Sequence, residues 1–180
     1  AYALDANTTA NYNTAIGNKA LSANTTGTPN TAVGHGSLEL NTVGVNLTAC
    51  GKGSLYANTT GSNNTAVGLN CLASNTTADD NTALGAWALN ATTTGHSNTA
   101  IGYQALFSNA TMGDNVAIGA QAMDSATGAE KSVAIGSQAG GALTTGTDGV
   151  YIGYKAGNAE TTGDKNVVIG YEALRDANGS

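Results

Sequence analysis

Side chains that could perform acid–base chemistry are few in this chain, which has twelve Asp and Glu and two His among 180 residues. A glycoside hydrolase needs two carboxyl groups that face each other across a groove at a defined separation. Asp79 and Asp80 are adjacent in a polar turn, which does not provide that arrangement. His35 and His96 stand alone, in different phases of the repeat described below. We therefore predict no catalytic residue, no cofactor and no enzymatic activity.

Two cysteines, Cys50 and Cys71, offer thiol or metal chemistry. Cys50 occupies a position where other repeats carry Val or Ile, and Cys71 one where they carry Ala or Ser. Free cysteine behaves as a small apolar residue, so we predict two free thiols, with a disulfide as the alternative. Neither histidine shares their phase, and we predict no metal site at these cysteines.

Acidic side chains recur in the loops before the expected strands, where a column of them could bind calcium. The glycine-aspartate nonapeptide pattern of calcium β-rolls is absent, and solvated charges in turns explain these residues equally well. Ion binding at these turns is therefore left open. The residues concerned are Asp79, Asp80, Asp114, Glu130, Asp148 and Asp164.

A glycine returns every seventeen residues along the whole chain, without an insertion or a slip. Around it each unit reads Asn-Thr-Ala-Ile/Val-Gly, two variable residues, Ala-Leu, two more variable residues, and Asn-Thr-Thr-Gly. This period is too long for a heptad and too short for a pair of helices, so it predicts one coil of a solenoid. The ten marker glycines are Gly17, Gly34, Gly51, Gly68, Gly85, Gly102, Gly119, Gly136, Gly153 and Gly170.

Each unit is expected to contain two strand-like pieces and two turns. The Thr-Ala-Val piece is short and partly β-branched, and the glycine after it can adopt the positive φ of a bend. Asn-Thr-Thr-Gly has turn-forming residues at both ends. Frequent Gly, Thr and Asn disfavour a helix. We predict an all-β fold, a solenoid of ten coils whose parallel, in-register strands lie about 4.8 Å apart.

Residues of equal phase form columns along such a solenoid. The apolar residue before each glycine and the Leu four residues after it are expected to form a thin core. The column before the glycine is Ile16, Val33, Cys50, Val67, Leu84, Ile101, Ile118, Ile135, Ile152 and Ile169.

The column next to it must point to the opposite face of the strand, because successive side chains alternate. We expect this second column to line the axis of a homotrimer, since so thin a core is meagre for a single chain. It consists of Ala15, Ala32, Ala49, Ala66, Ala83, Ala100, Ala117, Ala134, Tyr151 and Val168.

Two columns of Asn are expected to hydrogen-bond along the solenoid, as stacked Asn side chains do in cross-β assemblies. One column is Asn13, Asn30, Asn64, Asn81, Asn98 and Asn115. The other is Asn7, Asn24, Asn41, Asn58 and Asn75.

The charge content excludes some partners. Only 10% of the residues are charged, the net charge is −6, and the six basic residues do not cluster, which disfavours binding of nucleic acid. No apolar run approaches the ~18 residues of a membrane span, so we predict no membrane insertion. The chain begins part-way through a repeat, and we expect it to be a segment of a longer protein.

We expect residues 1–180 to form a single repeat domain whose character changes near Met112. Residues 1–112 are coils rich in Asn and Thr, and residues 113–180 are more charged, diverged coils of the same solenoid. In the second part four side chains of alternating sign are seventeen residues apart. They predict a charge ladder between neighbouring coils. The ladder is Asp114, Lys131, Asp148 and Lys165.

The repeat resembles known families. The unit from Asn98 to Asn109, with Gly102-Tyr103-Gln104-Ala105-Leu106, resembles repeats of phage and bacterial tail-fibre-like proteins. Asn115-Val116-Ala117-Ile118-Gly119 and Ser132-Val133-Ala134-Ile135-Gly136 are similar to the head repeats of trimeric autotransporter adhesins of the YadA type. The resemblance implies a left-handed parallel β-roll with three chains around one axis. The period is longer here than in the adhesin heads, which implies a longer outer turn.

The resemblance implies an extracellular segment of a virion tail fibre or a bacterial surface adhesin. The expected function is a rigid, homotrimeric rod that supports or forms an attachment site for a host or surface, with a cell-surface glycan or another host receptor as the partner. Tyr103, Tyr154 and Tyr171 share the place after the marker glycine, where rings could stack on sugars or pack between coils. Tyr56 shares a second such place with Phe107.

An alternative function is left open by the Thr pairs, which could form a regular lattice of hydroxyl groups that binds glycan or ice. These pairs are Thr25-Thr26, Thr59-Thr60, Thr76-Thr77 and Thr93-Thr94.

Overall fold

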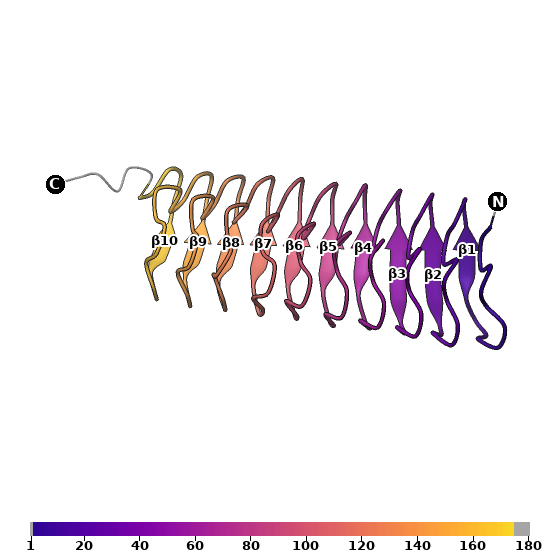
Figure 1. Cartoon of the computed structure of the whole chain (residues 1–180). Coiled ribbons are helices and arrows are strands. Elements are labelled where there is room, and N and C mark those ends of the chain that lie inside the picture. Colours follow the sequence, from indigo (N-terminus) through magenta and orange to yellow (C-terminus); the bar gives the residue numbers. More distant parts are fainter. Residues whose placement is uncertain (1, 175–180) are drawn as a thin grey trace.

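Ten short parallel strands, one in each coil, form a single sheet in sequence order (Figure 1). The computed structural model describes residues 2–174, and no helix occurs among them. The chain is therefore an all-β solenoid of seventeen-residue coils, as predicted. The strands are β1 (Thr14–Ile16), β2 (Asn30–Val33), β3 (Leu47–Cys50), β4 (Thr65–Val67), β5 (Thr82–Leu84), β6 (Thr99–Ile101), β7 (Val116–Ile118), β8 (Val133–Ile135), β9 (Val150–Ile152) and β10 (Val167–Ile169).

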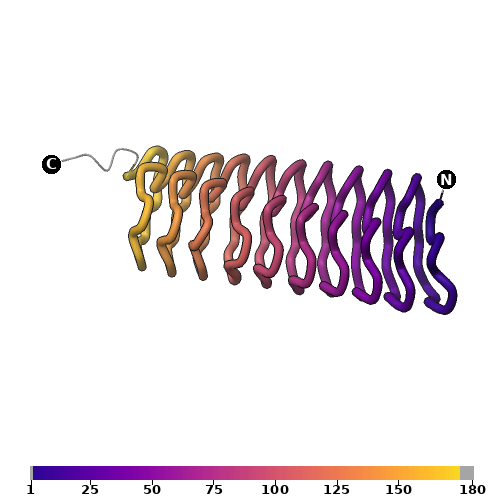
Figure 2. The backbone as a smooth tube through the Cα atoms, viewed as in Figure 1, coloured from indigo at the N-terminus to yellow at the C-terminus, as the bar shows by residue number. Residues whose placement is uncertain are grey.

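The strands pair in the register that the period predicts. Thr48 lies opposite Thr65, and Ala49 lies opposite Ala66, at an offset of seventeen residues. Figure 2 shows the backbone following the same path in one coil after another from the N-terminus to the C-terminus. Equivalent residues of all coils therefore form straight columns along the solenoid.

The remainder of each coil consists of turns and bends that also hydrogen-bond to the next coil. The Leu38 amide donates to the Ser54 carbonyl at 3.0 Å, and the Thr42 amide donates to the Thr59 carbonyl at 3.0 Å. The second strand-like piece expected in each unit does not form, and the Asn-Thr-Thr-Gly segment contains a bend. Inter-coil hydrogen bonds thus run along several sides of the solenoid, although only one side is a sheet.

Several positions in a typical coil adopt positive φ. In the fourth full coil these are Asn63 at 58°, Gly68 at 140°, Asn70 at 48° and Leu72 at 51°. A Cβ on Gly68 would lie 2.6 Å from the carbonyl carbon of Gly85, so that column has no space for a side chain. Leu is unusual in this conformation, which costs about 1–2 kcal/mol for a residue with a Cβ. The complete burial of Leu72 offsets that cost.

The predicted Leu column is confirmed as the core. Its side chains are fully buried and pack against the inner side of the sheet. Met123 continues the column after Leu106. The Leu members of the column are Leu21, Leu38, Leu55, Leu72, Leu89 and Leu106.

The two faces of the strand are exchanged relative to the prediction. The column expected to line a trimer axis points into the chain's own core: its members from Ala32 to Tyr151 are fully buried, Val168 is 8% exposed, and Ala15 is partly buried. The expected core column points outward, and Ile16 is 61% exposed. In the coils up to Ala134 the Leu and Met side chains fill the interior and leave space for a methyl group only, whereas Tyr151 and Val168 fit where Gly140 and Gly157 replace Leu in the core column. The corrected outward column is Ile16, Val33, Cys50, Val67, Leu84, Ile101, Ile118, Ile135, Ile152 and Ile169.

Both Asn columns are confirmed, and their members after the first coil are buried. In one column the amides bond to each other: Asn58 Nδ2 donates to Asn41 Oδ1 at 2.8 Å, and Asn75 Nδ2 donates to Asn58 Oδ1 at 2.7 Å. In the other column each side-chain oxygen accepts the backbone amide of the next coil, as Asn64 Oδ1 does from Asn81 at 2.9 Å. These bonds satisfy polar groups that would be costly to bury alone.

Candidate functional site

The outward side chains of β1–β10 form a flat strip, which we call the outer face. It consists of the corrected outward column and a second row two residues earlier in each strand. Because neighbouring strands lie about 4.8 Å apart, the ten-stranded strip is about 43 Å long. The second row is Thr14, Thr31, Thr48, Thr65, Thr82, Thr99, Val116, Val133, Val150 and Val167.

The outer face becomes wholly apolar in β7–β10, where Val replaces Thr in the second row. Val167 and Ile169 of the last strand are 69% and 64% exposed, Ile135 is 38% exposed, and the other outward residues of β7–β10 are half-buried. All-parallel sheets are normally covered on both faces. Here the inner side is covered by the Leu column, and the outer side is bare. A contiguous exposed apolar patch of this kind is typical of a surface that binds another protein chain.

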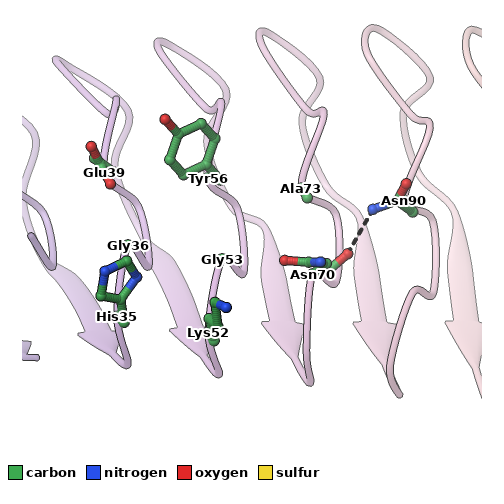
Figure 3. Close-up of a pocket in the computed structure, with 9 residues that line it drawn as sticks. All are labelled: His35, Gly36, Glu39, Lys52, Gly53, Tyr56, Asn70, Ala73 and Asn90. Atoms are coloured by element: carbon green, nitrogen blue, oxygen red, sulfur yellow. Dashed lines mark hydrogen bonds between the residues drawn. The ribbon is translucent and has the colours of Figure 1, made fainter. Parts of the chain in front are cut away.

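A groove of about 310 Å³ spans three to four coils (Figure 3). It lies on the side of the solenoid formed by the residues that come after each strand in the chain. It exists because two adjacent coils carry Gly at a position where other coils carry a long side chain. Gly36 and Gly53 take this position, which is Asn70, Trp87 and Gln104 in the next three coils. The two glycines therefore leave a gap in an otherwise continuous row of side chains.

Tyr56 and Glu39 form one side of the groove, and His35 and Lys52 form the other (Figure 3). A Cβ on Gly36 would lie 3.6 Å from Tyr56 Cδ2 and 3.2 Å from Glu39 Oε2, so the glycine lies directly against both side chains. The Tyr56 side chain is among the exposed large apolar ones, at 41%. The groove thus presents an accessible aromatic ring beside polar groups.

The charges at the groove do not cancel. Lys19 Nζ donates to Glu39 Oε1 at 2.9 Å, and this contact raises the pKa of Lys19. The Glu39 carboxylate is therefore already paired with a cation. Lys52 is exposed and forms no ion pair with any of the residues 2–174. Counted together with Lys19, which lies outside the lining, the groove consequently has a net charge of +1.

Two amides close one end of the groove. Asn90 Nδ2 donates to the Asn70 backbone carbonyl at 2.9 Å, which fixes the orientation of the Asn90 side chain. A Cβ on Gly53 would lie 2.4 Å from Asn70 Oδ1, so the Asn70 amide reaches into the space above that glycine. Amide groups here could donate to and accept from hydroxyl groups of a ligand.

The tyrosines predicted as possible glycan contacts are exposed, but they do not form one site. Tyr154 and Tyr171 lie in neighbouring coils and stack with their ring centroids 5.3 Å apart. Lys155 Nζ lies 5.2 Å from the centroid of the Tyr154 ring. Tyr103 lies three coils earlier in the same column, separated from them by Ala120 and Ser137. The stacked pair favours packing between coils, and glycan contact by these rings stays a prediction.

The predicted charge ladder is wrong as a set of ion pairs. Its four residues lie in one exposed column in the expected register, but among residues 2–174 none of them pairs with its neighbour in the ladder. Lys131 Nζ instead lies 3.8 Å from Glu130 Oε2 in its own turn. All four have positive φ in turns that face solvent, where their side chains gain little from meeting. The ladder consists of Asp114, Lys131, Asp148 and Lys165.

The residues considered for catalysis and metal binding remain separate. Cys50 and Cys71 are free, with Cys50 exposed and Cys71 buried. No group of three or more His, Cys, Asp or Glu side chains that could hold a metal ion occurs in the part of the chain that the structure describes. His35 contributes to the groove, whereas His96 lies in an exposed turn beside Ser97.

One acidic side chain is buried. Glu160 is 8% exposed and accepts a hydrogen bond from Asn166 Nδ2. It takes the place of an Asn in the buried column and lies close to Tyr151 in the core. It lines neither the groove nor the outer face, so we assign it to packing of the last coils.

The Thr pairs present only half of the free hydroxyl groups that the alternative function assumed, because the second Thr of each pair is exposed and unbonded among the described residues but the first is not. The first Thr of each pair bonds to the next coil: Thr59 Oγ1 donates to the Thr76 carbonyl at 3.0 Å, and Thr76 Oγ1 to the Thr93 carbonyl at 3.2 Å. The Thr side chains of the outer face, such as Thr48 and Thr82, make no hydrogen bond to the described residues and are exposed. Exposed Thr hydroxyls are therefore present both on the outer face and at the second position of each Thr pair.

The groove and the outer face were both missed by the sequence predictions. For the groove a signal was present, because Gly36 and Gly53 interrupt a column of long side chains. For the outer face, the sequence correctly predicted that successive side chains of each strand point to opposite faces. It did not predict which of these side chains point outward.

No helix that could span a membrane is found among residues 2–174. The chain matches no known family model, no curated protein and no solved structure. The outer face and the groove are therefore the features that bear on function.

Proposed function

We propose that this chain is a structural and adhesive segment of an extracellular fibre, either a viral tail fibre or a bacterial surface adhesin. Three copies pack their outer faces around a common axis and form a rigid rod. The rod supports or forms a site of attachment to a host or a surface. The observation that carries this proposal is the bare, apolar outer face of the parallel sheet.

Self-association is favoured over a different partner because the outer face repeats with a constant period. A second copy offers the same spacing of about 4.8 Å between coils, so side chains of two copies can interdigitate along the whole strip. A partner without this period would match it only locally. The C-terminal coils contribute most, since both outward residues of β7–β10 are Val or Ile.

The molar mass in solution tests this assembly. A homotrimer has three times the chain mass of 17.7 kDa. Ile135→Lys places a charge on the outer face, and Thr145→Lys places the same charge on an exposed bend of the same coil. We expect Ile135→Lys to dissociate the trimer and Thr145→Lys to leave it intact. A monomeric wild-type chain at micromolar concentration contradicts the proposal.

A second candidate function is binding of ice through the Thr row of the outer face. The exposed hydroxyls of Thr31, Thr48 and Thr82, beside a row of apolar side chains, favour it. This function requires the outer face to be free in solution, whereas the rod requires it to be covered. Thermal hysteresis shown by a monomeric chain, and lost in Thr48→Lys, supports ice binding against the rod.

A further inference from the structure

We infer that the groove at Tyr56 binds an acidic sugar residue, a pyranose that carries a carboxylate, within a longer glycan chain. Its volume of about 310 Å³ lies at the lower end of the range of roughly 300–1,000 Å³ that small-molecule sites occupy. The groove is open along the solenoid (Figure 3). It therefore suits one sugar residue whose neighbours continue out of the groove along the surface.

The aromatic ring supplies the apolar contact that a sugar needs. Tyr56 is exposed on the side of the groove, and Gly36 lies against its ring where a longer side chain would cover it. The C–H face of a pyranose can pack on such a ring while the Tyr hydroxyl faces water. Glycine at positions 36 and 53 keeps this ring face accessible, whereas the row is filled by Asn70 and Trp87 in the next coils.

The polar groups of the groove match hydroxyl groups. The Asn70 amide reaches over Gly53, and Asn90 is oriented by its bond to the Asn70 carbonyl. The Glu39 carboxylate, held by Lys19, has a second oxygen that can accept from a sugar hydroxyl. These groups are positioned before a ligand arrives, which lowers the entropy cost of binding.

The charge favours an acidic sugar over a neutral one. Lys52 is the cation on the open side of the groove, and it has no ion-pair partner among the described residues. Glu39 is neutralised by Lys19, which lies outside the lining, so the lining and Lys19 together carry a net charge of +1 in a chain whose net charge is −6. A carboxylate of the ligand would pair with Lys52 and could also accept a hydrogen bond from His35.

This inference rests on the proposed attachment function, because it gives the rod a ligand chemistry. It does not depend on the trimer, since none of the residues that line the groove belongs to the outer face. Failure of glycan binding with an intact trimer would overturn the inference alone. A monomeric chain that still binds the glycan would contradict the proposed trimeric rod and support the glycan site.

The test is a titration followed by NMR with three acidic probes: tetragalacturonate, a hyaluronan tetrasaccharide and 3′-sialyllactose. Each probe is compared with its carboxyl-reduced form, which has the same ring without the charge. We expect at least one acidic probe to bind with a millimolar or lower dissociation constant. We expect its reduced form to bind roughly tenfold more weakly, and binding to weaken with added salt.

Two variants locate the site. Gly36→Gln introduces the residue that Gln104, Gln121 and Gln138 carry at the same place with positive φ, so the coil can accommodate it. It should fill the groove and abolish binding with an unchanged melting temperature. Lys52→Gln should weaken binding of the acidic probe by about tenfold and affect the reduced probe little.

Lys165→Gln, in an exposed turn far along the solenoid, is the matched control and should bind as the wild type does. Absence of binding by all three probes would overturn the inference. Binding that Gly36→Gln leaves unchanged would do the same.

Discussion

The ring of Tyr151 occupies the space that a side chain at Gly157 would need: a Cβ on Gly157 would lie 2.3 Å from Tyr151 Cδ1. On the other side of the ring, a Cβ on Gly140 would lie 3.4 Å from Tyr151 Cδ2. Earlier coils have Ala in the place of Tyr151 and Leu or Met in the places of the two glycines. The large side chain of Tyr151, in the column that carries Ala in earlier coils, is thus compensated by two glycines in the Leu column.

This compensation predicts strongly non-additive mutations. Tyr151→Ala alone should lower the free energy of unfolding by about 3–5 kcal/mol, because it leaves a cavity between two glycines. Gly157→Leu alone should also destabilise the chain, because the new side chain collides with the ring. The triple variant Tyr151→Ala, Gly140→Leu, Gly157→Leu restores the packing of the earlier coils and should recover most of the loss. Additive effects in denaturant titrations would contradict the compensation.

Stability should fall at alkaline pH because of Tyr151. Burial, with the Glu160 carboxylate as the second cause, raises the pKa of Tyr151 to about 12. The unfolded chain releases this proton near pH ~10, so the stabilisation is complete below that pH and is lost as the pH rises from about 10 through 12. Burial similarly raises the pKa of Cys71 to about 12, with loss beginning near pH ~9.

Tyr151→Phe in a Cys71→Ala background isolates the tyrosine. The Tyr151 hydroxyl is buried close to the Glu160 carboxylate, and Phe keeps the packed ring, so the melting temperature at pH 7 should change little. Between pH 10 and 12 the Phe variant should lose less stability than the parent. Equal losses in thermal melts across this range would rule out Tyr151 as the cause.

The buried Asn column should be important for stability. Asn58→Ala removes the donor to Asn41 Oδ1 and to the Gly61 carbonyl, and the acceptor of Asn75 Nδ2. We expect a loss of about 2–4 kcal/mol, because buried partners are left unsatisfied. Thr60→Ala, two residues away and exposed, is the control and should change stability by less than about 0.5 kcal/mol. A loss of similar size in both variants would argue against a role for the column.

Two adjacent residues of β4 test which side of the sheet is the core. Ala66 is fully buried, and Val67 belongs to the outer face. Ala66→Asp buries a charge and should unfold the coils around it, a loss of more than about 4 kcal/mol. Val67→Asp should keep the β-sheet circular dichroism of the wild type and weaken association. The opposite pattern, with Val67→Asp unfolded and Ala66→Asp folded, would restore the original assignment of the faces.

Much of the fold follows from the sequence because every coil repeats the same local structure. The period sets the register, Leu marks a core column wherever it recurs, and Asn can be buried in a column because identical neighbours bond to each other. The Asn58 ladder and the Leu72 core were predictable for this reason. The pattern could not predict which side chains of a three-residue strand point into the core. Alternation separates Ala66 from Val67, but only the space left by the Leu column decides which one lies inside.

The left-handed backbone of several residues was not predictable from residue type, although the core position of Leu72 was. Leu72 adopts a backbone conformation that its residue type disfavours, so no local propensity would place it there. Lys131 and Asp148 lie in turns with the same kind of backbone, where their side chains point into solvent instead of toward each other. The groove exists because Gly36 and Gly53 have no side chains. This becomes apparent only when they are compared with the residues at the same position in other coils.

Cys50 is a natural probe of the outer face, because its thiol lies in the outward column and is exposed in a single chain. Cys71→Ala removes the other thiol and introduces the residue that the same position carries at Ala88. We propose to measure the rate at which a maleimide labels Cys50 in this variant, with and without Ile135→Lys. We expect labelling to be at least roughly tenfold slower in the assembled chain than in the dissociated one. Equal, fast labelling of both would contradict the claim that copies of this chain meet through the outer face.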